Sequence, residues 1–357
     1  MKYRRYLKIL LASLFACMAL WAVTVALADP FFHYHKPWFG MQPVITDNRY
    51  QNPGMARHFD YDSIIVGSSM TENFRASWFD EAFGCQTLKL SYEAGRTQNY
   101  AYIMETAFAT HPLRYVFFGL DIDPLLDEFG KDYFTVPEYL YDDNPCNDVK
   151  YLFNKTIFFS DVIPTVVKNI RGAVEPLDEA YTWDDEHTFS RAETLASYWD
   201  PPLAESELPA DAYLENYTRN LGENILPQVA AHPETTFYIY FPPYSILFWH
   251  YRLSVGDIDA VMQLLDYTAA SLLAYDNVRL YSFLGAADII TDLDNYKDYT
   301  HHTAEINRLV LDAMAADDAA YRLTPDNYRQ RFRELEELAR GYDYDALLAE
   351  KRNASAN

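Results

Sequence analysis

Short apolar runs that alternate with helical patterns limit the possible folds of this chain most strongly. The runs are rich in β-branched and aromatic residues, as expected for strands, and lie at residues 62–67, 87–90, 114–119, 237–241 and 278–283. Stretches with helical spacing lie between them, for example at 71–83 and 257–274. Strands that alternate with helices form a parallel sheet with both faces covered. We therefore predict an α/β domain around a central parallel five-stranded sheet.

The N-terminus carries an apolar segment of a different kind. Residues 9–28 contain no charge, follow a basic cluster at residues 2–8 and end before Asp29-Pro30. A helix of about 20 apolar residues crosses roughly 30 Å of hydrocarbon, and basic flanks stay in the cytoplasm. We predict a cytoplasmic stub at 1–8 and a transmembrane signal-anchor at 9–28, so that this single-pass protein of the cell membrane carries an extracytoplasmic domain. A cleaved signal peptide is the alternative, because residues 26–28 read Ala-Leu-Ala.

Composition excludes several classes of partner. The net charge of -23, from 52 acidic and 29 basic residues, disfavours nucleic acid, whose phosphates require a positive field. Of three cysteines Cys17 lies in the apolar segment, so Cys85 and Cys146 could form at most one disulfide. No Cys and His spacing typical of zinc appears. We expect neither a metal nor a cofactor.

The rest of the chain is divided by its sequence pattern. We interpret residues 29–60 as a membrane-proximal linker, 61–316 as the α/β domain and 317–357 as a helical tail. The stretch at about 121–234, between the third and fourth strands, is too long for a simple connection. It is either a cap inserted over the ligand crevice or a segment that only packs against the domain.

A serine pair lies where the first strand meets its helix, in Gly67-Ser68-Ser69-Met70-Thr71. In parallel sheets ligands bind beyond the carboxyl ends of the strands, so a hydroxyl here would face the crevice. Helix N-terminal amides could stabilise an oxyanion beside it. The alternative is that one serine only caps the helix. Thr71 stands where the nucleophile elbow Gly-x-Ser-x-Gly has its second glycine.

A second group of polar residues lies in the loop after the fifth strand. Asp298 and His301 are three residues apart, just ahead of a helical pattern that starts at about Thr303. An activated serine needs a base, usually His, and a carboxylate that fixes the tautomer of that base. Asp298 as a plain turn residue is the alternative. Both groups fall on the same edge of the predicted sheet, in the chain order Ser, Asp, His.

These motifs resemble those of the SGNH (GDSL-type) hydrolase superfamily, across about residues 60–316. The resemblance implies a three-layer α/β fold with a flavodoxin-like sheet. It further implies that Ser69 is the nucleophile, His301 the base and Asp298 its orienting carboxylate. Gly95, in the loop after the second strand, matches a glycine whose amide, with that of Ser69, forms the oxyanion hole.

One motif departs from the family pattern. Where the family has Gly-x-Asn-Asp, this chain has Gly119-Leu120-Asp121-Ile122, and an ionised Asp121 would repel an oxyanion. Either Asp121 is protonated, another donor substitutes, or the protein is not a fast hydrolase. Arg96 is a candidate donor or substrate contact, and a surface salt bridge is its alternative role. The chain also resembles, more loosely, the DltD-like proteins and the alginate acetylation proteins, which act on cell-envelope polymers.

Aromatic residues follow the fourth strand. Tyr244, Phe248 and Trp249 could form a platform on which a sugar stacks, or they could belong to the core. Tyr244 and Trp249 are our candidate substrate contacts in this segment.

The sequence therefore favours a membrane-anchored, extracytoplasmic SGNH-like serine esterase or acyltransferase. Its expected partner is a cell-envelope polysaccharide or lipid-linked glycan. A non-catalytic surface or envelope-assembly protein that retains the fold is the alternative, and Asp121 is its main support. A phosphodiesterase with a metal held by Asp121, Asp123 and Asp298 is a third possibility.

Overall fold

The computed structural model describes residues 2–132 and 135–354 and divides the chain into two compact units. In the described part, the N-terminal unit comprises residues 2–60 and 135–181. The sheet unit comprises residues 61–132 and 182–354. Each unit is described by itself below.

The sheet unit is built on one six-stranded sheet in the order β2-β1-β3-β4-β5-β6. Its strands are β1 (Ser63–Val66), β2 (Thr87–Lys89), β3 (Tyr115–Gly119), β4 (Thr236–Phe241), β5 (Val278–Ser282) and β6 (Arg322–Leu323). The first five pair in parallel, in the flavodoxin-like order, and β6 pairs antiparallel with β5. The predicted α/β class and the five predicted strands are confirmed, but the sheet has six strands rather than five.

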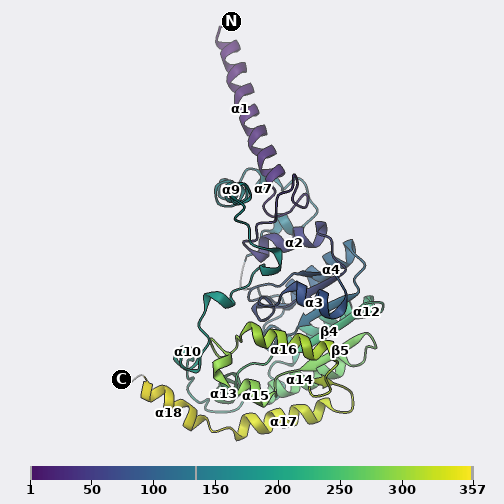
Figure 1. The fold of residues 1–357 in the computed structure, drawn as a ribbon, viewed down its shortest axis with the longest axis vertical. Helices are drawn as coiled ribbons and strands as arrows, with labels where there is room; N and C mark the ends of the chain where they lie inside the picture. Colours follow the sequence, from purple (N-terminus) through teal and green to yellow (C-terminus); the bar gives the residue numbers. More distant parts are fainter. Residues whose placement is uncertain (1, 133–134, 355–357) are drawn as a thin grey trace. The chain divides into compact units, whose positions relative to one another are not determined.

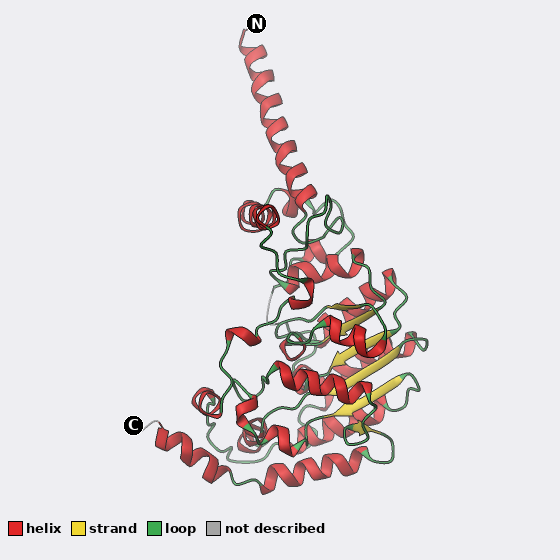
Figure 2. Cartoon of the chain, in the orientation of Figure 1, coloured by secondary structure: helices red, strands yellow, loops and turns green. Residues whose placement is uncertain are grey.

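Helices lie on both faces of this sheet (Figure 2). Those of the first half are η1 (Ser69–Thr71), α3 (Ala76–Phe83), α4 (Thr97–Thr110), α5 (Ile122–Leu126), η4 (Asp184–Glu186), α10 (Arg191–Ser197), α11 (Leu214–Arg219), η5 (Asn220–Ile225) and α12 (Leu226–Ala231). Those of the second half are α13 (Ile246–Val255), α14 (Ile258–Leu272), α15 (Ala287–Ile290), η6 (Leu293–Asn295), α16 (Ala304–Ala315), α17 (Tyr328–Gly341) and α18 (Tyr344–Ala354). The expected helical tail thus contributes a strand as well as α17 and α18.

Alternation along the strands divides the core between the two faces. Ile65, Phe117 and Tyr240 form a buried cluster with Phe79 of α3 and Val310 of α16. The neighbouring strand residues point to the other face, where the Phe118 ring meets Tyr100 of α4 at 5.3 Å. Because both faces are buried, the strands read as nearly continuous apolar runs, which is why the sequence predicts them well.

The N-terminal unit contains the long helix α1 (Lys2–Ala28), shown in purple in Figure 1. Its other helices are α2 (Asn48–His58), α6 (Glu138–Tyr141), α7 (Val149–Leu152), α8 (Lys155–Ile157), η2 (Phe158–Val162), α9 (Ile163–Arg171) and η3 (Leu177–Glu179). A small core joins Val25 and Phe31 to Tyr151, Ile157 and Val162. The predicted linker at 29–60 therefore holds a helix, and the predicted insertion at 121–234 is shared between the two units.

One helix in the described residues, Tyr3–Ala28, is long and apolar enough to cross a membrane, with a mean hydropathy of 2.3. Only 6% of an apolar 18-residue stretch of this helix is buried in the protein, whereas the core helix of a soluble fold is mostly buried. Because α1 begins at Lys2, residues 2–8 of the predicted stub are part of this helix.

Candidate functional site

The turn after β1 differs from the predicted strand-to-helix junction. A one-turn helix η1 follows the strand, and the α-helix begins only at Ala76. Ser68 caps this turn, because its hydroxyl accepts a hydrogen bond from the Met70 amide at 3.2 Å. Ser69 is therefore free of the capping role and faces the last loop of the sheet unit. The helix predicted at 71–83 is present only from Ala76 to Phe83.

Gly67 allows the chain to make this turn. Its φ is +151°, and an added Cβ would lie 2.5 Å from the Thr71 methyl group and 3.0 Å from the carbonyl of Gly119. We expect Gly67→Ala to lower the free energy of unfolding by roughly 1–3 kcal/mol in urea titrations, from backbone strain and overpacking. Gly222→Ala is the matched control, because no atom beyond its chain neighbours and its own helix backbone lies within 4 Å of its added Cβ. Equal stabilities of the two variants would contradict the account.

Ser69, His301 and Asp298 form a continuous chain of hydrogen bonds. The Ser69 hydroxyl lies 2.8 Å from Nε2 of His301, and Nδ1 of His301 lies 2.8 Å from Oδ2 of Asp298. An ionised carboxylate only accepts, so Nδ1 carries the proton and Nε2 is left to accept from the serine. The structure thus brings together three residues that are up to 232 positions apart in sequence.

The loop that carries Asp298 stabilises the ionised form of its carboxyl group. Its Oδ1 accepts hydrogen bonds from the amides of Thr300 and His301 at 2.9 and 2.8 Å, and Lys297 lies 3.3 Å from Oδ2. Burial alone would raise the pKa of Asp298, but its hydrogen bonds and charge interaction with His301, together with these amides, hold the pKa well below its usual range. The carboxylate therefore stays ionised and can stabilise a positive charge on His301.

Trp183 is a further neighbour of the triad that the sequence did not single out. Its indole N–H donates to the carbonyl of Ser69 at 3.3 Å, and its ring meets the edge of His301 at 5.4 Å. Asn73 holds the Trp183 amide at 2.9 Å. We assign Trp183 as a positioning residue, since it contacts both Ser69 and His301. The acidic aromatic stretch around it was visible in the sequence, but nothing there indicated its partners.

A cavity of about 180 Å³ opens beside the serine. Its lining residues come from the ends of four strands and from the last loop: Ser68, Ser69, Met70, Ala94, Arg96, Asp121, Asp123, Pro124, Tyr244, Thr300 and His301. This is the edge at which ligands bind in open parallel sheets. The nucleophile candidate and its base therefore both face a space that a small acyl group could enter.

The amides proposed for the oxyanion hole differ in availability. The Ser69 amide donates no hydrogen bond to any other residue that the structure describes. The Gly95 amide already donates to the carbonyl of Tyr92 at 2.9 Å, and Gly95 is not among the cavity-lining residues. The Gly95 amide could donate to an oxyanion only if it gave up its hydrogen bond to Tyr92. In this structure a second oxyanion donor, beside the Ser69 amide, must therefore be another residue.

Asp121 lines the cavity and is the last acceptor of a directed hydrogen-bond chain. The Ile122 amide donates to the Tyr244 hydroxyl at 3.3 Å, and that hydroxyl donates to Oδ1 of Asp121 at 2.5 Å. Oδ2 is buried and has no hydrogen-bond partner among the described residues. Because Oδ1 is used as an acceptor, a proton carried by this carboxyl sits on Oδ2.

The surroundings of Asp121 favour its neutral form. Burial raises the pKa of Asp121, and the nearby charge of Asp123 adds to the shift, while the nearby Ser68 and Tyr244 hydroxyls and the charge of His301 oppose it. No Lys or Arg of the described chain forms an ion pair with it. Arg96 instead pairs with Asp127 at 2.7 Å, and the buried Arg252 pairs with Asp257 and Asp123.

The raised pKa of Asp121 predicts how stability changes with pH. The stability from this protonated group is fully present below its unfolded pKa of about 3.8 and is lost as pH rises through the native value. Asp121→Asn lacks this loss, so its melting temperature should gain on the wild type as the pH rises above the unfolded pKa of about 3.8. The exposed Asp288→Asn serves as control in the same calorimetric scans. A difference independent of pH would contradict the assignment.

Of the three residues predicted to contact substrate, two line the cavity and one is buried in the core. Tyr244 and Arg96 line the cavity, although Arg96 is engaged in its salt bridge with Asp127. Trp249 is fully buried, with an exposed fraction of 0%, and Phe248 is buried beside it. Trp249 therefore cannot serve as a sugar platform in this structure, because helix α13 turns it into the core.

Among the described residues, no three His, Cys, Asp or Glu side chains gather as a metal site would require. Asp123 pairs with Arg252, and Asp298 with His301. Two of the three carboxylates invoked for a metal-dependent phosphodiesterase thus have a charged partner other than a metal.

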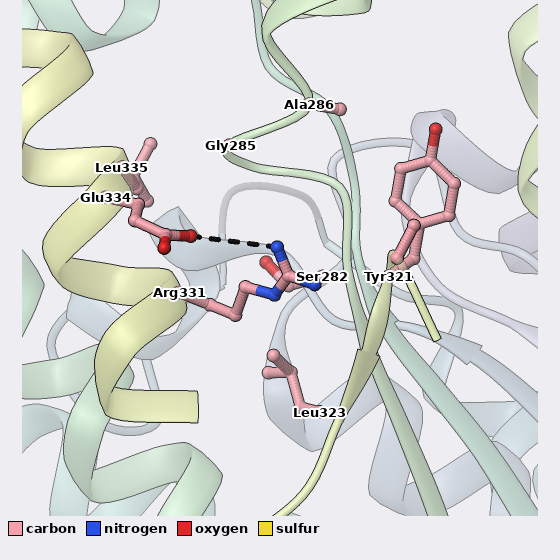
Figure 3. Close-up of a pocket in the computed structure, with 9 residues that line it drawn as sticks. Ser282, Gly285, Ala286, Tyr321, Leu323, Arg331, Glu334 and Leu335 are labelled. Atoms are coloured by element: carbon pink, nitrogen blue, oxygen red, sulfur yellow. Dashed lines mark ion pairs between the residues drawn. The ribbon is translucent and has the colours of Figure 1, made fainter. Parts of the chain in front are cut away.

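A second, smaller cavity of about 70 Å³ lies between β5, β6 and α17 (Figure 3). Its charged groups, Arg331 and Glu334, form an ion pair at 3.6 Å. None of its lining residues is a His or a Cys. It lacks the paired nucleophile and base found at the carboxyl edge of the sheet.

The sheet unit thus combines a mostly parallel α/β fold with a hydrogen-bonded Ser, His and Asp, the arrangement on which serine-dependent acyl transfer is built. The sequence matches no family model and no curated protein. Similar solved structures include one described, provisionally, as a platelet activating factor from Streptococcus pneumonia. That similarity has a TM-score of 0.39 at 11% identity and covers 76% of this chain and 90% of the other.

Proposed function

We propose that this chain is a membrane-anchored serine esterase or acyltransferase of the SGNH type that acts outside the cytoplasm on a cell-envelope or exported glycan. The observation that carries the proposal is the chain of 2.8 Å contacts from Ser69 through His301 to Asp298 beside a cavity. A capped turn or a plain polar loop does not require these three side chains to meet.

In the proposed reaction the Ser69 oxygen attacks the acyl carbon while His301 Nε2 takes the hydroxyl proton. The ester bond breaks as His301 returns that proton to the leaving sugar oxygen, which leaves the acyl group on Ser69. Water or another sugar hydroxyl then attacks the acyl carbon while His301 takes its proton. The bond between the acyl carbon and Ser69 breaks as His301 returns the proton to the Ser69 oxygen. The oxyanion is held by the Ser69 amide and, in this account, by the protonated Oδ2 of Asp121.

Protonated Asp121 replaces the amide donor that the family pattern has at this place. A carboxylic acid kept neutral by an apolar site can donate to an oxyanion, as a buried Asp does in ketosteroid isomerase. The unpaired Oδ2 and the Tyr244 hydroxyl on Oδ1 support this role. The engaged amide of Gly95 is then not needed.

Retention of the anchor is supported by the packing of α1. Val25 belongs to the core of the N-terminal unit, and Trp21 stacks on Phe158 at 3.9 Å. Cleavage after Ala28 would remove both residues from that core. We expect the chain isolated from membranes to begin before Asp29, as N-terminal sequencing would show. Tethering would hold the domain near envelope polymers at high effective concentration.

A neutral acylated sugar suits the cavity better than an anionic one. Arg96, which lines the cavity, is already paired with Asp127, and the other charged lining residues include the carboxyl groups of Asp121 and Asp123. The overall charge of -23 acts in the same direction.

A non-catalytic envelope-assembly protein is the second candidate, favoured by the occupied amide of Gly95 and by Asp121 in place of an amide donor. Hydrolysis of a small aryl acetate by the purified full chain distinguishes the two. We expect turnover in the wild type and in the exposed-loop control Ser206→Ala, and none above background in Ser69→Ala. Equal rates in wild type and Ser69→Ala would favour the second candidate.

A further inference from the structure

An apolar stripe runs along one exposed face of the N-terminal unit. Residues 155–171 form a continuous helical segment of α8, η2 and α9. Its outward residues are Phe159, Ile163, Val167 and Ile170, with exposed fractions of 60, 40, 36 and 80%. Spacings of three and four residues place them on one side of the helix, while Val162 and Thr165 face the core. An exposed apolar stripe of this kind marks a surface that contacts another protein or a membrane.

The stripe lies at the end of α1. The Trp21 ring stacks on Phe158 and meets Phe159 edge-on at 6.0 Å. Figure 1 shows α1 along its length and α9 end-on beside its last turns, so the two helices cross. A helix that lies across the end of a membrane-spanning helix runs along the membrane surface.

Two further exposed aromatic residues lie in a loop that contacts both α9 and the end of α1. Trp38 and Phe39 have exposed fractions of 45 and 83%. Their loop is bound to α9, because the Gln42 amide donates to the Asn169 side chain at 2.7 Å. It is bound to α1 as well, because His35 contacts the carbonyl of Ala26 at 2.9 Å and stacks on Trp38. Aromatic residues gather at the interface between hydrocarbon and lipid headgroups.

The charges beside the stripe fit the same location. Lys155, Lys168 and Arg171 lie at its two ends, and Asp161, the acidic residue of this segment, is half-buried rather than exposed. Basic residues beside an apolar face bind the headgroup region, most strongly where lipids are anionic.

We propose that the apolar stripe, together with Trp38 and Phe39, is embedded in the extracytoplasmic headgroup interface of the membrane that α1 crosses. The lipid surface is favoured over a second copy or another protein because the stripe is continuous with the apolar surface of α1. The N-terminal unit is then held at two places, which fixes its orientation to the bilayer. The proposal rests on the anchor of the proposed function and not on its serine chemistry.

Depth-dependent quenching tests this location on the full chain. Its three cysteines are replaced, and single cysteines at Ile163→Cys or Ile170→Cys carry an environment-sensitive fluorophore. The chain is reconstituted in phosphatidylcholine and phosphatidylglycerol vesicles with spin labels near the headgroup or deep in the acyl chains. We expect shallow labels to quench both sites at least about twofold more than deep labels do, since interfacial helices insert only about 5–10 Å.

Two further sites provide controls. A chain that keeps only native Cys17 reports on α1 and should be quenched most by the deep label, whereas Glu205→Cys, in an exposed loop, should be quenched by neither. Quenching at positions 163 and 170 no greater than at 205, with Cys17 quenched, overturns the interface and leaves the anchor. Blue-shifted but unquenched emission there means that protein covers the stripe, which also overturns it. An unquenched Cys17 overturns the anchor and this inference together, while the aryl acetate assay tests the serine separately.

Discussion

Asp298→Asn is expected to lower the turnover of acyl esters by a factor on the order of 10⁴ while leaving the fold intact. The amide can donate to Nδ1 of His301, which favours the tautomer with the proton on Nε2. That nitrogen, 2.8 Å from the Ser69 hydroxyl, can then no longer accept the serine proton. Steady-state kinetics on an aryl acetate measures the loss, and near-ultraviolet circular dichroism monitors the fold.

The matched control is Asp288→Asn, an exposed carboxylate after the same strand that does not line the cavity. It should keep the activity of the wild type. An Asp298→Asn variant with more than about a tenth of the wild-type rate would show that His301 is not oriented by this carboxylate, since the loss of such a partner costs far more in serine enzymes.

Asp121→Asn is expected to retain activity and to extend it to higher pH. In the proposed mechanism the oxyanion donor of the wild type is the protonated Oδ2, so activity should fall as pH rises through the raised pKa of Asp121. The asparagine amide donates at every pH and removes this alkaline limit. Asp121→Ala removes the donor and should cost on the order of a hundredfold to a thousandfold in turnover.

The pH profile separates this role from a structural one. A carboxylate needed only for packing would give similar losses in both variants and an unchanged profile. A wild-type rate that rises throughout the alkaline range would also contradict the account. Tyr244→Phe removes the hydroxyl that donates to Oδ1 and that lowers the pKa of Asp121. It should therefore raise the pH at which activity falls.

The parts of the fold that sequence predicted are those with a strong local pattern. The five parallel strands are buried on both faces, so each is a nearly continuous apolar run. β6 has only two residues and pairs at the edge, which leaves no pattern to detect. The helix after β1 begins late because Ser68 caps the separate turn η1, and this depends on contacts rather than on spacing.

The site was predictable where topology determines it. Ser69 and His301 follow β1 and β5, whose carboxyl ends face one edge, so their approach follows from strand order. Trp183 reaches Ser69 across 114 residues of an irregular connection, and no local signal gives that contact. Trp249 was misplaced because helix α13 is buried around much of its circumference and shows no polar face in sequence.

Covalent labelling of the full chain with a serine-directed fluorophosphonate tests the central claim most directly. The account predicts that wild-type protein in its membrane is labelled, that mass spectrometry places the adduct on the Ser69 oxygen, and that Ser69→Ala and His301→Ala are not labelled although folded. Undiminished labelling of Ser69→Ala would contradict it.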